Sequence, residues 1–172
     1  MNTQYTFHTH EFPPLYDENS TVLILGSFPS TASRAQQFYY GHPRNRFWQI
    51  IAALTGEAFP ETTAQKRDLA LRSHIALWDV IDECEIIGSS DSSIRNAVPT
   101  DIPRILREAP IRSIYTNGNL ASKLYAKYQQ ELTGIAAIPL PSTSPANAAW
   151  SLERLLQRWQ IIRLDLSHSE GN

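Results

Sequence analysis

The segment "TVLILGS", residues 21–27, decides the predicted fold. Its β-branched and leucine residues run without a charged side chain up to Gly26. Such a run is typical of a strand that is buried on both faces, which occurs mainly in parallel sheets. We therefore predict a buried parallel strand whose C-terminal end opens into the loop "GSFPS", residues 26–30.

Strand-like and helical segments alternate along the rest of the chain. Further strands are predicted at residues 74–81 and 111–118 and within residues 134–145. Helices are predicted at residues 45–56, 62–73, 102–109, 119–130 and 146–160, and a polar loop at residues 88–101. This alternation predicts an α/β fold in which a short central parallel sheet lies between two helical layers, a three-layer α/β/α arrangement.

The chain of 172 residues has the size of one ordinary domain. We expect a single domain over residues 1–172, with an N-terminal segment at residues 1–15 and a loose tail at residues 166–172. The apolar runs are far too short to span a membrane, and the N-terminus lacks the features of a secretory signal. We therefore expect a cytoplasmic protein without a membrane segment.

Cysteine and histidine usage argues against redox and metal chemistry. Cys84 is the only cysteine, and its neighbours Glu83 and Glu85 disfavour a thiolate. His8 and His10 form a pair without an apparent third metal ligand. The single glycine of "LGSFPS" does not match a dinucleotide-binding loop. We predict no metal and no cofactor.

Three loops rich in polar residues or proline follow three of the predicted strands. They are "GSFPS", "TNGN" at residues 116–119 and "LPSTSPAN" at residues 140–147. In an open parallel sheet the ligand crevice lies beyond the carboxyl ends of the strands. We therefore expect these loops to meet at one site.

The segment "YYGHPRNRFW", residues 39–48, joins aromatic rings to polar side chains. Asn45 lies between two arginines and directly before a helical pattern, so on residue type alone it is a favoured helix N-cap. Phe47 and Trp48 follow the helical periodicity, which predicts that both belong to the core.

Taken in order, these motifs resemble the hypoxanthine-DNA glycosylase branch of the uracil-DNA glycosylase superfamily. The resemblance covers about residues 10–159 and rests on "LILGSFPS", "FYYGHPRNRFW", "LWDVIDECEIIGSSDSSIRNAVPTDI", "IYTNGNLA", "LPSTSPAN" and "SLERLL". Each motif alone is a weak signal, and their order makes the combination specific. The resemblance implies a uracil-DNA glycosylase-like fold and an enzyme that hydrolyses the N-glycosidic bond of deaminated bases, chiefly hypoxanthine in deoxyinosine.

"GHPRNRFW" is also similar to a segment of the mismatch-specific uracil-DNA glycosylases, but one departure separates the two groups. In the mismatch-specific enzymes the first loop reads Gly-x-Asn-Pro, and its Asn helps to position the hydrolytic water. Phe28 stands at that position in this chain. In the hypoxanthine branch the catalytic Asn is carried by the second segment, where it corresponds to Asn45. The resemblance therefore favours deoxyinosine over uracil, with Asn45 either donating to the base or accepting from a water.

Asp101 and Asn117 are the other catalytic candidates, because they lie in segments that match the family. Each has an ordinary structural alternative, Asp101 as a helix N-cap and Asn117 as the turn residue before Gly118. A carboxylate at Asp101 near the sugar would orient water or offset the positive charge of the reacting sugar carbon.

The resemblance also implies a base-binding pocket and a surface that contacts DNA. A flipped base is held between flat aromatic faces, for which Phe28, Phe38, Tyr39 and Tyr40 are candidates, although not all four can stack. The predicted base pocket consists of Gly26, Ser27, Phe28, Pro29, Tyr39, Tyr40 and His42. The predicted DNA contacts are Arg44, Arg46, Ser142, Thr143, Ser144 and Asn147, with Arg34 in the same basic patch. The formal net charge of −2 gives no general attraction to DNA, so these local contacts have to supply it.

A monofunctional enzyme is expected, because strand nicking through a Schiff base needs a lysine nucleophile. Lys66, Lys123 and Lys127 are the only lysines, and they lie on predicted surface helices away from the loops. The expected partner is DNA containing deaminated bases, and a monomer is expected by similarity to related enzymes. Two alternatives stay open: a mismatch-specific uracil or thymine glycosylase, and a catalytically silent DNA-binding module on the same fold.

Overall fold

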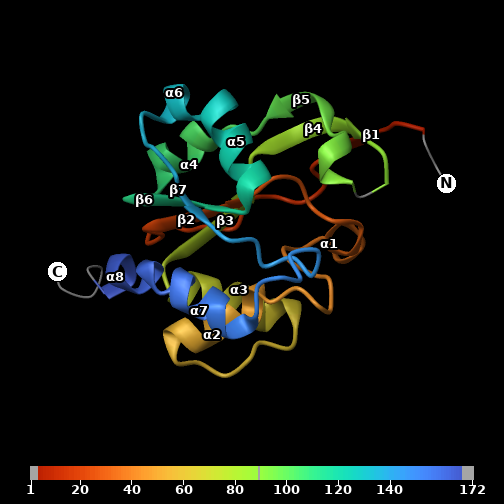
Figure 1. The fold of residues 1–172 in the computed structure, drawn as a ribbon. Coiled ribbons are helices and arrows are strands. Elements are labelled where there is room, and N and C mark those ends of the chain that lie inside the picture. Colours follow the sequence, from red (N-terminus) through yellow and green to blue (C-terminus); the bar gives the residue numbers. More distant parts are fainter. Residues whose placement is uncertain (1–3, 89, 168–172) are drawn as a thin grey trace.

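The computed structural model describes residues 4–88 and 90–167. Its central sheet has four parallel strands in the order β3-β2-β6-β7 (Figure 1). The strands are β2 (Val22–Gly26), β3 (Ile75–Asp79), β6 (Ser113–Asn117) and β7 (Ile138–Leu140). Every residue of β2 and β3 is buried, as expected of strands covered on both faces. The predicted parallel sheet is confirmed.

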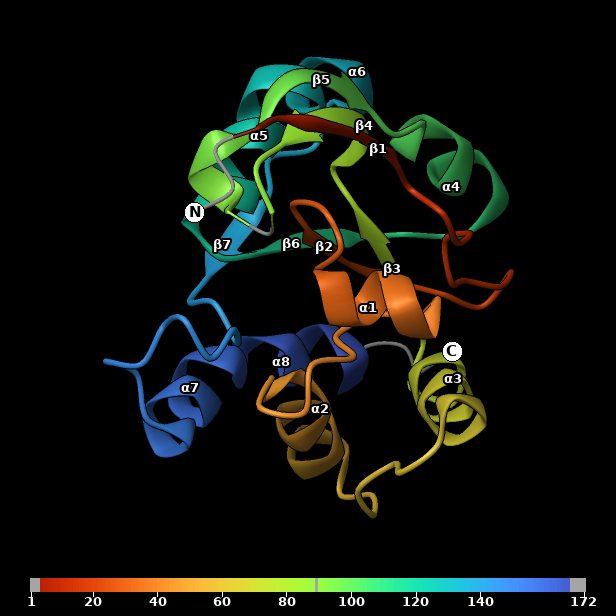
Figure 2. The same cartoon turned by 90° about the vertical axis from the view of Figure 1, so that its right-hand side faces the viewer.

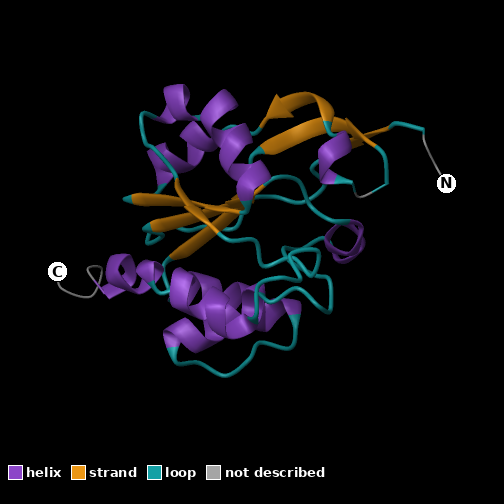
Figure 3. Ribbon diagram, in the orientation of Figure 1, coloured by secondary structure: helices purple, strands orange, loops and turns teal. Residues whose placement is uncertain are grey.

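Helices cover both faces of this sheet (Figures 1 and 3). One layer contains α2 (Phe47–Thr55), α3 (Thr63–Arg72), α7 (Leu152–Trp159) and α8 (Ile161–Ser167). The other contains α4 (Ile102–Glu108), α5 (Asn119–Tyr128) and α6 (Gln130–Thr133). The short helix α1 (Thr31–Gln36) follows the first loop (Figure 2). The three-layer arrangement predicted from the sequence is therefore confirmed.

A second, antiparallel sheet was not predicted. It has the order β1-β4-β5 and contains β1 (Thr6–Thr9), β4 (Ile81–Ile86) and β5 (Arg95–Pro99). The prediction of a polar loop over residues 88–101 was wrong, because β5 and the 3₁₀ turn Asp91–Ser93 lie within it. β4 and β5 pair with register shifts, and such irregular, partly polar strands carry little of the alternation that identifies a strand in a sequence.

Segment boundaries differ from the prediction at both ends of the chain. The N-terminal segment contains strand β1, and residues 166–167 of the expected tail belong to α8, whereas residues 168–172 lie outside the described part of the chain. The helix expected from residue 146 begins only at Leu152, where the Ser151 side chain accepts the backbone N–H of Arg154 at 3.2 Å. Residues 141–151 therefore form a long loop.

Aromatic packing fixes the position of α2. Phe47 and Trp48 are buried, as predicted, and the Phe47 ring meets the Trp159 ring of α7 edge to face at 5.9 Å between centroids. This packing holds the first turn of α2, and Asn45 two residues before its start, at the carboxyl ends of the parallel strands.

Candidate active site

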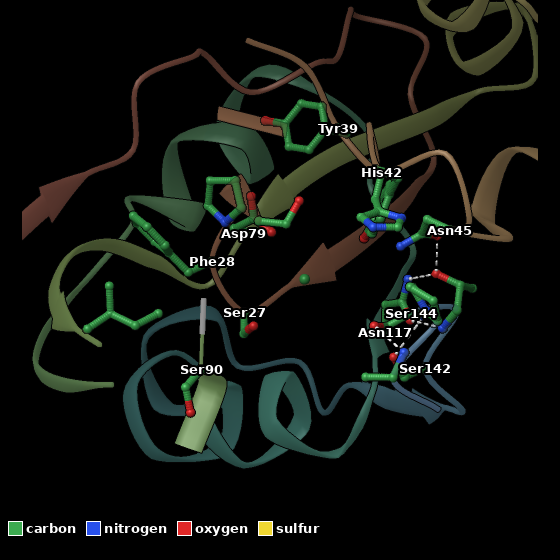
Figure 4. A pocket seen from close by; sticks show the side chains of 18 residues that line it. Ser27, Phe28, Tyr39, His42, Asn45, Asp79, Ser90, Asn117, Ser142 and Ser144 are labelled. Carbon is green, nitrogen blue, oxygen red and sulfur yellow. Dashed lines mark hydrogen bonds between the residues drawn. The ribbon is translucent and has the colours of Figure 1, made fainter. Parts of the chain in front are cut away.

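A cavity of about 480 Å³ lies at the carboxyl ends of the strands, where the three loops meet as expected (Figure 4). Its size is in the range of pockets that hold small molecules. Its walls contain most of the predicted residues: Gly26, Ser27, Phe28, Pro29, Tyr39, Tyr40, His42, Asn45, Asn117, Ser142, Thr143 and Ser144. Six further residues were not predicted: Ser30, Asp79, Ile86, Ser90, Pro145 and Ala146.

Asn45 lies one residue before the N-cap of α2, which is Arg46, so the helix cap expected at Asn45 is not formed. Its Oδ1 accepts the backbone N–H of Phe47 at 2.9 Å and the Thr143 hydroxyl at 2.8 Å. A backbone N–H can only donate, so the accepting atom is the amide oxygen. The amide nitrogen of Asn45 is turned toward the cavity (Figure 4). What Asn45 offers a ligand is therefore a pair of N–H donors.

Thr143 and Asn117 extend this arrangement across the pocket wall. The Asn117 amide nitrogen donates to Oγ1 of Thr143 at 3.0 Å, and Oδ1 of Asn117 accepts the backbone N–H of Thr143 at 3.0 Å. Thr143 is fully buried. The chain of hydrogen bonds Asn45–Thr143–Asn117, called the amide bracket below, joins the start of α2, the loop after β7 and the end of β6.

Aromatic side chains form the opposite part of the wall. Phe28 and Tyr39 line the cavity and are buried, and Tyr39 also donates its hydroxyl to the backbone carbonyl of Pro13 at 2.9 Å. Tyr40 stacks on Phe47 at 4.0 Å between ring centroids, so one of its faces is covered. Phe38 does not line the cavity; it stacks on the core residue Trp48.

The hydroxyl of Tyr40 is buried and has no hydrogen-bond partner of good geometry among the described residues. Burial and the charge of Asp79 raise the pKa of this hydroxyl, although the nearby Asn117 amide works in the other direction. The Tyr40 hydroxyl is therefore a neutral group at any physiological pH.

Arg46, which was expected to contact DNA, uses its side chain for contacts within the protein. Its guanidinium donates to the backbone carbonyls of Ser144 at 2.9 Å and Asn147 at 3.1 Å, and also to that of Trp150. Two of these carbonyls, those of Ser144 and Asn147, also accept backbone N–H groups, from Asn147 and Trp150, within the loop that precedes α7. Arg46 is a structural clamp of the loop 141–151.

Arg44 and Asn147, two other predicted DNA contacts, differ in their surroundings. Arg44 is exposed beside the pocket residue His42, whose Nδ1 accepts the Arg44 backbone N–H at 3.0 Å. Asn147 lies outside the cavity and uses its amide nitrogen to hold the Ser142 carbonyl at 3.0 Å. Because α7 begins only at Leu152, its N-terminus does not lie at residues 142–147.

The structure does not bring Asp101 to the cavity. Its side chain is 61% exposed, lies 3.9 Å from the guanidinium of Arg107, and makes no capping hydrogen bond to α4. The exposed position at the start of α4 separates it from the loops that follow β2, β6 and β7.

The carboxylate in the cavity is instead Asp79, the last residue of β3. Its Oδ2 lies 2.7 Å from Nε2 of His10, and the two side chains are 6% and 1% exposed. Burial alone would lower the pKa of His10, but the hydrogen bond and charge of Asp79 outweigh it and raise that pKa. A polar residue ending an otherwise apolar strand is the signal by which the sequence could have revealed Asp79.

Gly26 leaves room for this carboxylate. A Cβ atom on Gly26 would lie 2.5 Å from Oδ1 of Asp79 and 3.4 Å from the hydroxyl of Tyr40. A larger residue at the end of β2 would therefore displace Asp79. Gly26 of the loop "GSFPS" thus provides the space that the Asp79 carboxylate occupies, in addition to its place in the turn.

Among the described residues, no group of three or more His, Cys, Asp or Glu side chains is placed to hold a metal ion. Nor does the described part of the chain contain a helix with the length and apolar character to cross a bilayer.

Comparison with known proteins assigns this chain to a family. The model of the uracil DNA glycosylase superfamily matches residues 13–163, and the chain belongs to this superfamily. A Methanosarcina acetivorans protein named hypoxanthine DNA glycosylase is 36% identical over 155 residues, which cover 88% of this chain and 95% of that protein. A protein of the same name from Methanosarcina barkeri is 42% identical over 86 residues, covering 49% of this chain and 54% of that protein.

A solved structure agrees with this assignment. The solution NMR structure of a candidate uracil DNA glycosylase from Methanosarcina acetivorans superposes with a TM-score of 0.78 at 34% identity. The superposition covers 91% of this chain and 97% of that one.

Proposed function

We propose that this protein is a monofunctional DNA glycosylase that hydrolyses the N-glycosidic bond of deaminated bases, chiefly hypoxanthine in deoxyinosine, in base excision repair. The similarity to two relatives named hypoxanthine DNA glycosylase, one of them along 88% of the chain, supports the activity and the substrate. The placement of Asn45 in the cavity is the structural observation that carries the proposal.

Base excision requires that the target nucleotide leaves the helical stack and enters a pocket. The cavity offers the aromatic side chains of Phe28 and Tyr39 and the polar groups of the amide bracket on different sides. Arg44, Ser142 and Ser144 lie around it and are the proposed contacts to the DNA backbone.

Asn45 acts on the leaving base as a hydrogen-bond donor. Cleavage places positive charge on the sugar and negative charge on the base, and donors held in place beforehand stabilise that negative charge. Oδ1 of Asn45 is engaged by Phe47 and Thr143, so the free N–H groups face the base rather than a water below the sugar. The amide bracket fixes this orientation before the base enters.

The reaction consumes water and leaves an abasic site. The bond from C1′ to the base breaks, the water oxygen bonds to C1′, and the base departs with the bonding electron pair and gains a proton. None of the three lysines lines the cavity, which supports hydrolysis rather than a Schiff base. We infer further that one domain over residues 1–172 acts as a monomer on DNA in the cytoplasm.

The alternative of a mismatch-specific uracil or thymine glycosylase is less well supported. In the first loop Phe28 presents a ring to the cavity, where those enzymes need an amide for the water. The alternative of a silent DNA-binding module has no specific observation in its favour, because the cavity holds an oriented amide and a carboxylate.

The proposal is tested with labelled oligonucleotides that carry one deoxyinosine, one deoxyuridine or no damage. Strand breaks that appear after alkali at deoxyinosine, together with free hypoxanthine in the supernatant, are the expected result. Breaks without alkali would contradict the monofunctional mechanism. A folded protein that releases no base from any substrate would contradict the proposed activity and favour the binding module.

A further inference from the structure

The carboxylate of Asp79 has one oxygen engaged and one open to the base pocket. Oδ2 is held by His10, and among the described residues Oδ1 receives no hydrogen bond. The side chain is only 6% exposed, and it lines the cavity (Figure 4). Oδ1 is therefore an acceptor that a ligand N–H in the cavity would satisfy.

His10 keeps Asp79 in this state. Nδ1 of His10 lies 2.8 Å from the backbone carbonyl of Phe12, which can only accept, and Nε2 lies 2.7 Å from the carboxylate. Both ring nitrogens therefore carry hydrogens, and the ring is an imidazolium that balances the charge of Asp79. The raised pKa of His10 agrees with this pairing. Toward the cavity, Asp79 is left as an acceptor only.

Deamination changes the hydrogen-bonding edge of a base in the way that such an acceptor detects. N1 of adenine is a bare acceptor, whereas N1 of hypoxanthine carries a hydrogen beside a carbonyl, as does N3 of uracil. A carboxylate oxygen accepts from an N–H and repels a lone pair. Asp79 therefore distinguishes hypoxanthine from adenine, and uracil from cytosine.

We propose that Oδ1 of Asp79 reads the ring N–H that deamination creates, N1–H in the case of hypoxanthine, and that His10 is its positioning residue. The depth of Asp79 in the cavity supports a contact with the base rather than activation of the attacking water. Asp79 is buried at the end of β3 behind Gly26, whereas the pocket residue His42 is exposed. A base enters edge first and reaches the buried end, and its sugar stays near the opening. The inference rests on the proposed function and specifies how that function selects its substrate.

The test compares excision of hypoxanthine with excision of unsubstituted purine from deoxynebularine, whose N1 is a bare acceptor. Single-turnover rates are measured for the wild type, Asp79→Asn and Asp79→Ala, and the ratio between the two substrates is formed for each protein. The intrinsic lability of each glycosidic bond cancels when these ratios are compared between proteins. Thermal unfolding of each variant shows that it is folded.

Asp82→Asn is the matched control. The Asp82 carboxylate also acts on the charge of His10 but does not line the cavity. We expect its substrate ratio to remain within about twofold of the wild-type ratio, as for a change that leaves the base contacts intact. A larger shift would show that the charge of His10, rather than the Asp79 contact, sets the selectivity.

We expect the ratio to fall at least about tenfold in Asp79→Asn, because sites that hydrogen-bond a substrate N–H reject analogues that lack it. The amide lowers the ratio in either orientation: its oxygen accepts more weakly than a carboxylate, and its N–H groups donate to bare N1. Asp79→Ala is expected to lower it further. If both rates fall equally and the ratio stays unchanged in either folded variant, Asp79 does not read the base and the inference is wrong. A wild type inactive on deoxyinosine would instead contradict the proposed function itself.

Discussion

The two sides of the pocket are held in place by different interactions. On one side the amide bracket joins Asn45, Thr143 and Asn117, from three different segments of the chain, through neutral hydrogen bonds. On the other side Asp79 is held by a single charged partner, His10, from the N-terminal segment. The bracket should therefore be insensitive to pH and contribute moderately to stability, whereas the buried ion pair should be sensitive to pH and costly to break.

The largest expected effect on stability comes from breaking the ion pair. Asp79→Ala leaves the imidazolium of His10 buried without its partner, and removing one member of a buried pair costs about 3–5 kcal/mol. Denaturant unfolding measures this loss. The double variant His10→Phe with Asp79→Ala is the control, because it removes both charges and should recover part of the lost stability. A loss below about 1 kcal/mol in Asp79→Ala would show that the pair is not buried as described.

Arg46→Lys tests the clamp that supports the bracket side of the pocket. A lysine cannot reach the Ser144, Asn147 and Trp150 carbonyls together, so we expect a loss of about 1.5–3 kcal/mol, as for hydrogen bonds to a charged group. The salt dependence of DNA binding should stay the same, because the positive charge is retained and does not contact phosphate. Arg44→Gln is the comparison variant, for which we expect a weaker salt dependence and unchanged stability. Unchanged stability together with an altered salt dependence in Arg46→Lys would contradict the clamp and indicate that Arg46 contacts DNA.

Thr143→Val removes the hydroxyl at the centre of the bracket while keeping the shape of the side chain. We expect a loss of about 1 kcal/mol or somewhat more, because the amide groups of Asn45 and Asn117 lose their shared partner. Thr143→Ser retains the hydroxyl and should restore the Asn45 contact. Equal excision rates in the valine and serine variants would show that the bracket does not orient Asn45.

The smallest expected effect is the dependence of stability on pH. The pKa of His10 is raised in the folded protein above the ordinary value of about 6.5. Its contribution to the free energy of unfolding is complete below pH 6.5 and is lost as the pH rises through the raised pKa. His10→Gln should remove this decline. Unfolding curves from pH 6 upward measure the difference in stability between the two proteins, which should shrink as the pH rises. A difference that grows with pH would contradict a raised pKa.

The parts of the fold and site that could be predicted from the sequence are local ones. The apolar run of β2, the periodicity of α2 and the order of the loop motifs all lie within short segments, so Asn45, Asn117 and Thr143 were found. The resemblance to a family supplied the role of Asn45, which residue type alone would have assigned to a helix cap. The structure places the N-cap one residue later, at Arg46, and Asn45 instead accepts the backbone N–H of Phe47.

The parts that could not be predicted depend on contacts between distant segments. His10 meets Asp79 only because β1 pairs with β4, which continues from β3, and no local pattern contains that pairing. The clamp role of Arg46 depends on carbonyls about 100 residues further along the chain, and an arginine beside an active-site motif is equally consistent with a phosphate contact. Asp101 was placed at the site by its position in a matching motif, although its side chain lies in solvent.

The proposed role of the Asn45 amide, donation to the leaving base, is measured in the variant Asn45→Asp. The carboxylate keeps an oxygen that accepts the N–H of Phe47 and the Thr143 hydroxyl, but it cannot donate. We predict that excision at deoxyinosine, measured under single-turnover conditions, falls about 10²–10³-fold while the unfolding temperature changes little. Full activity in a folded Asn45→Asp variant would contradict the claim, because a residue that acts by accepting from water would keep its function as a carboxylate.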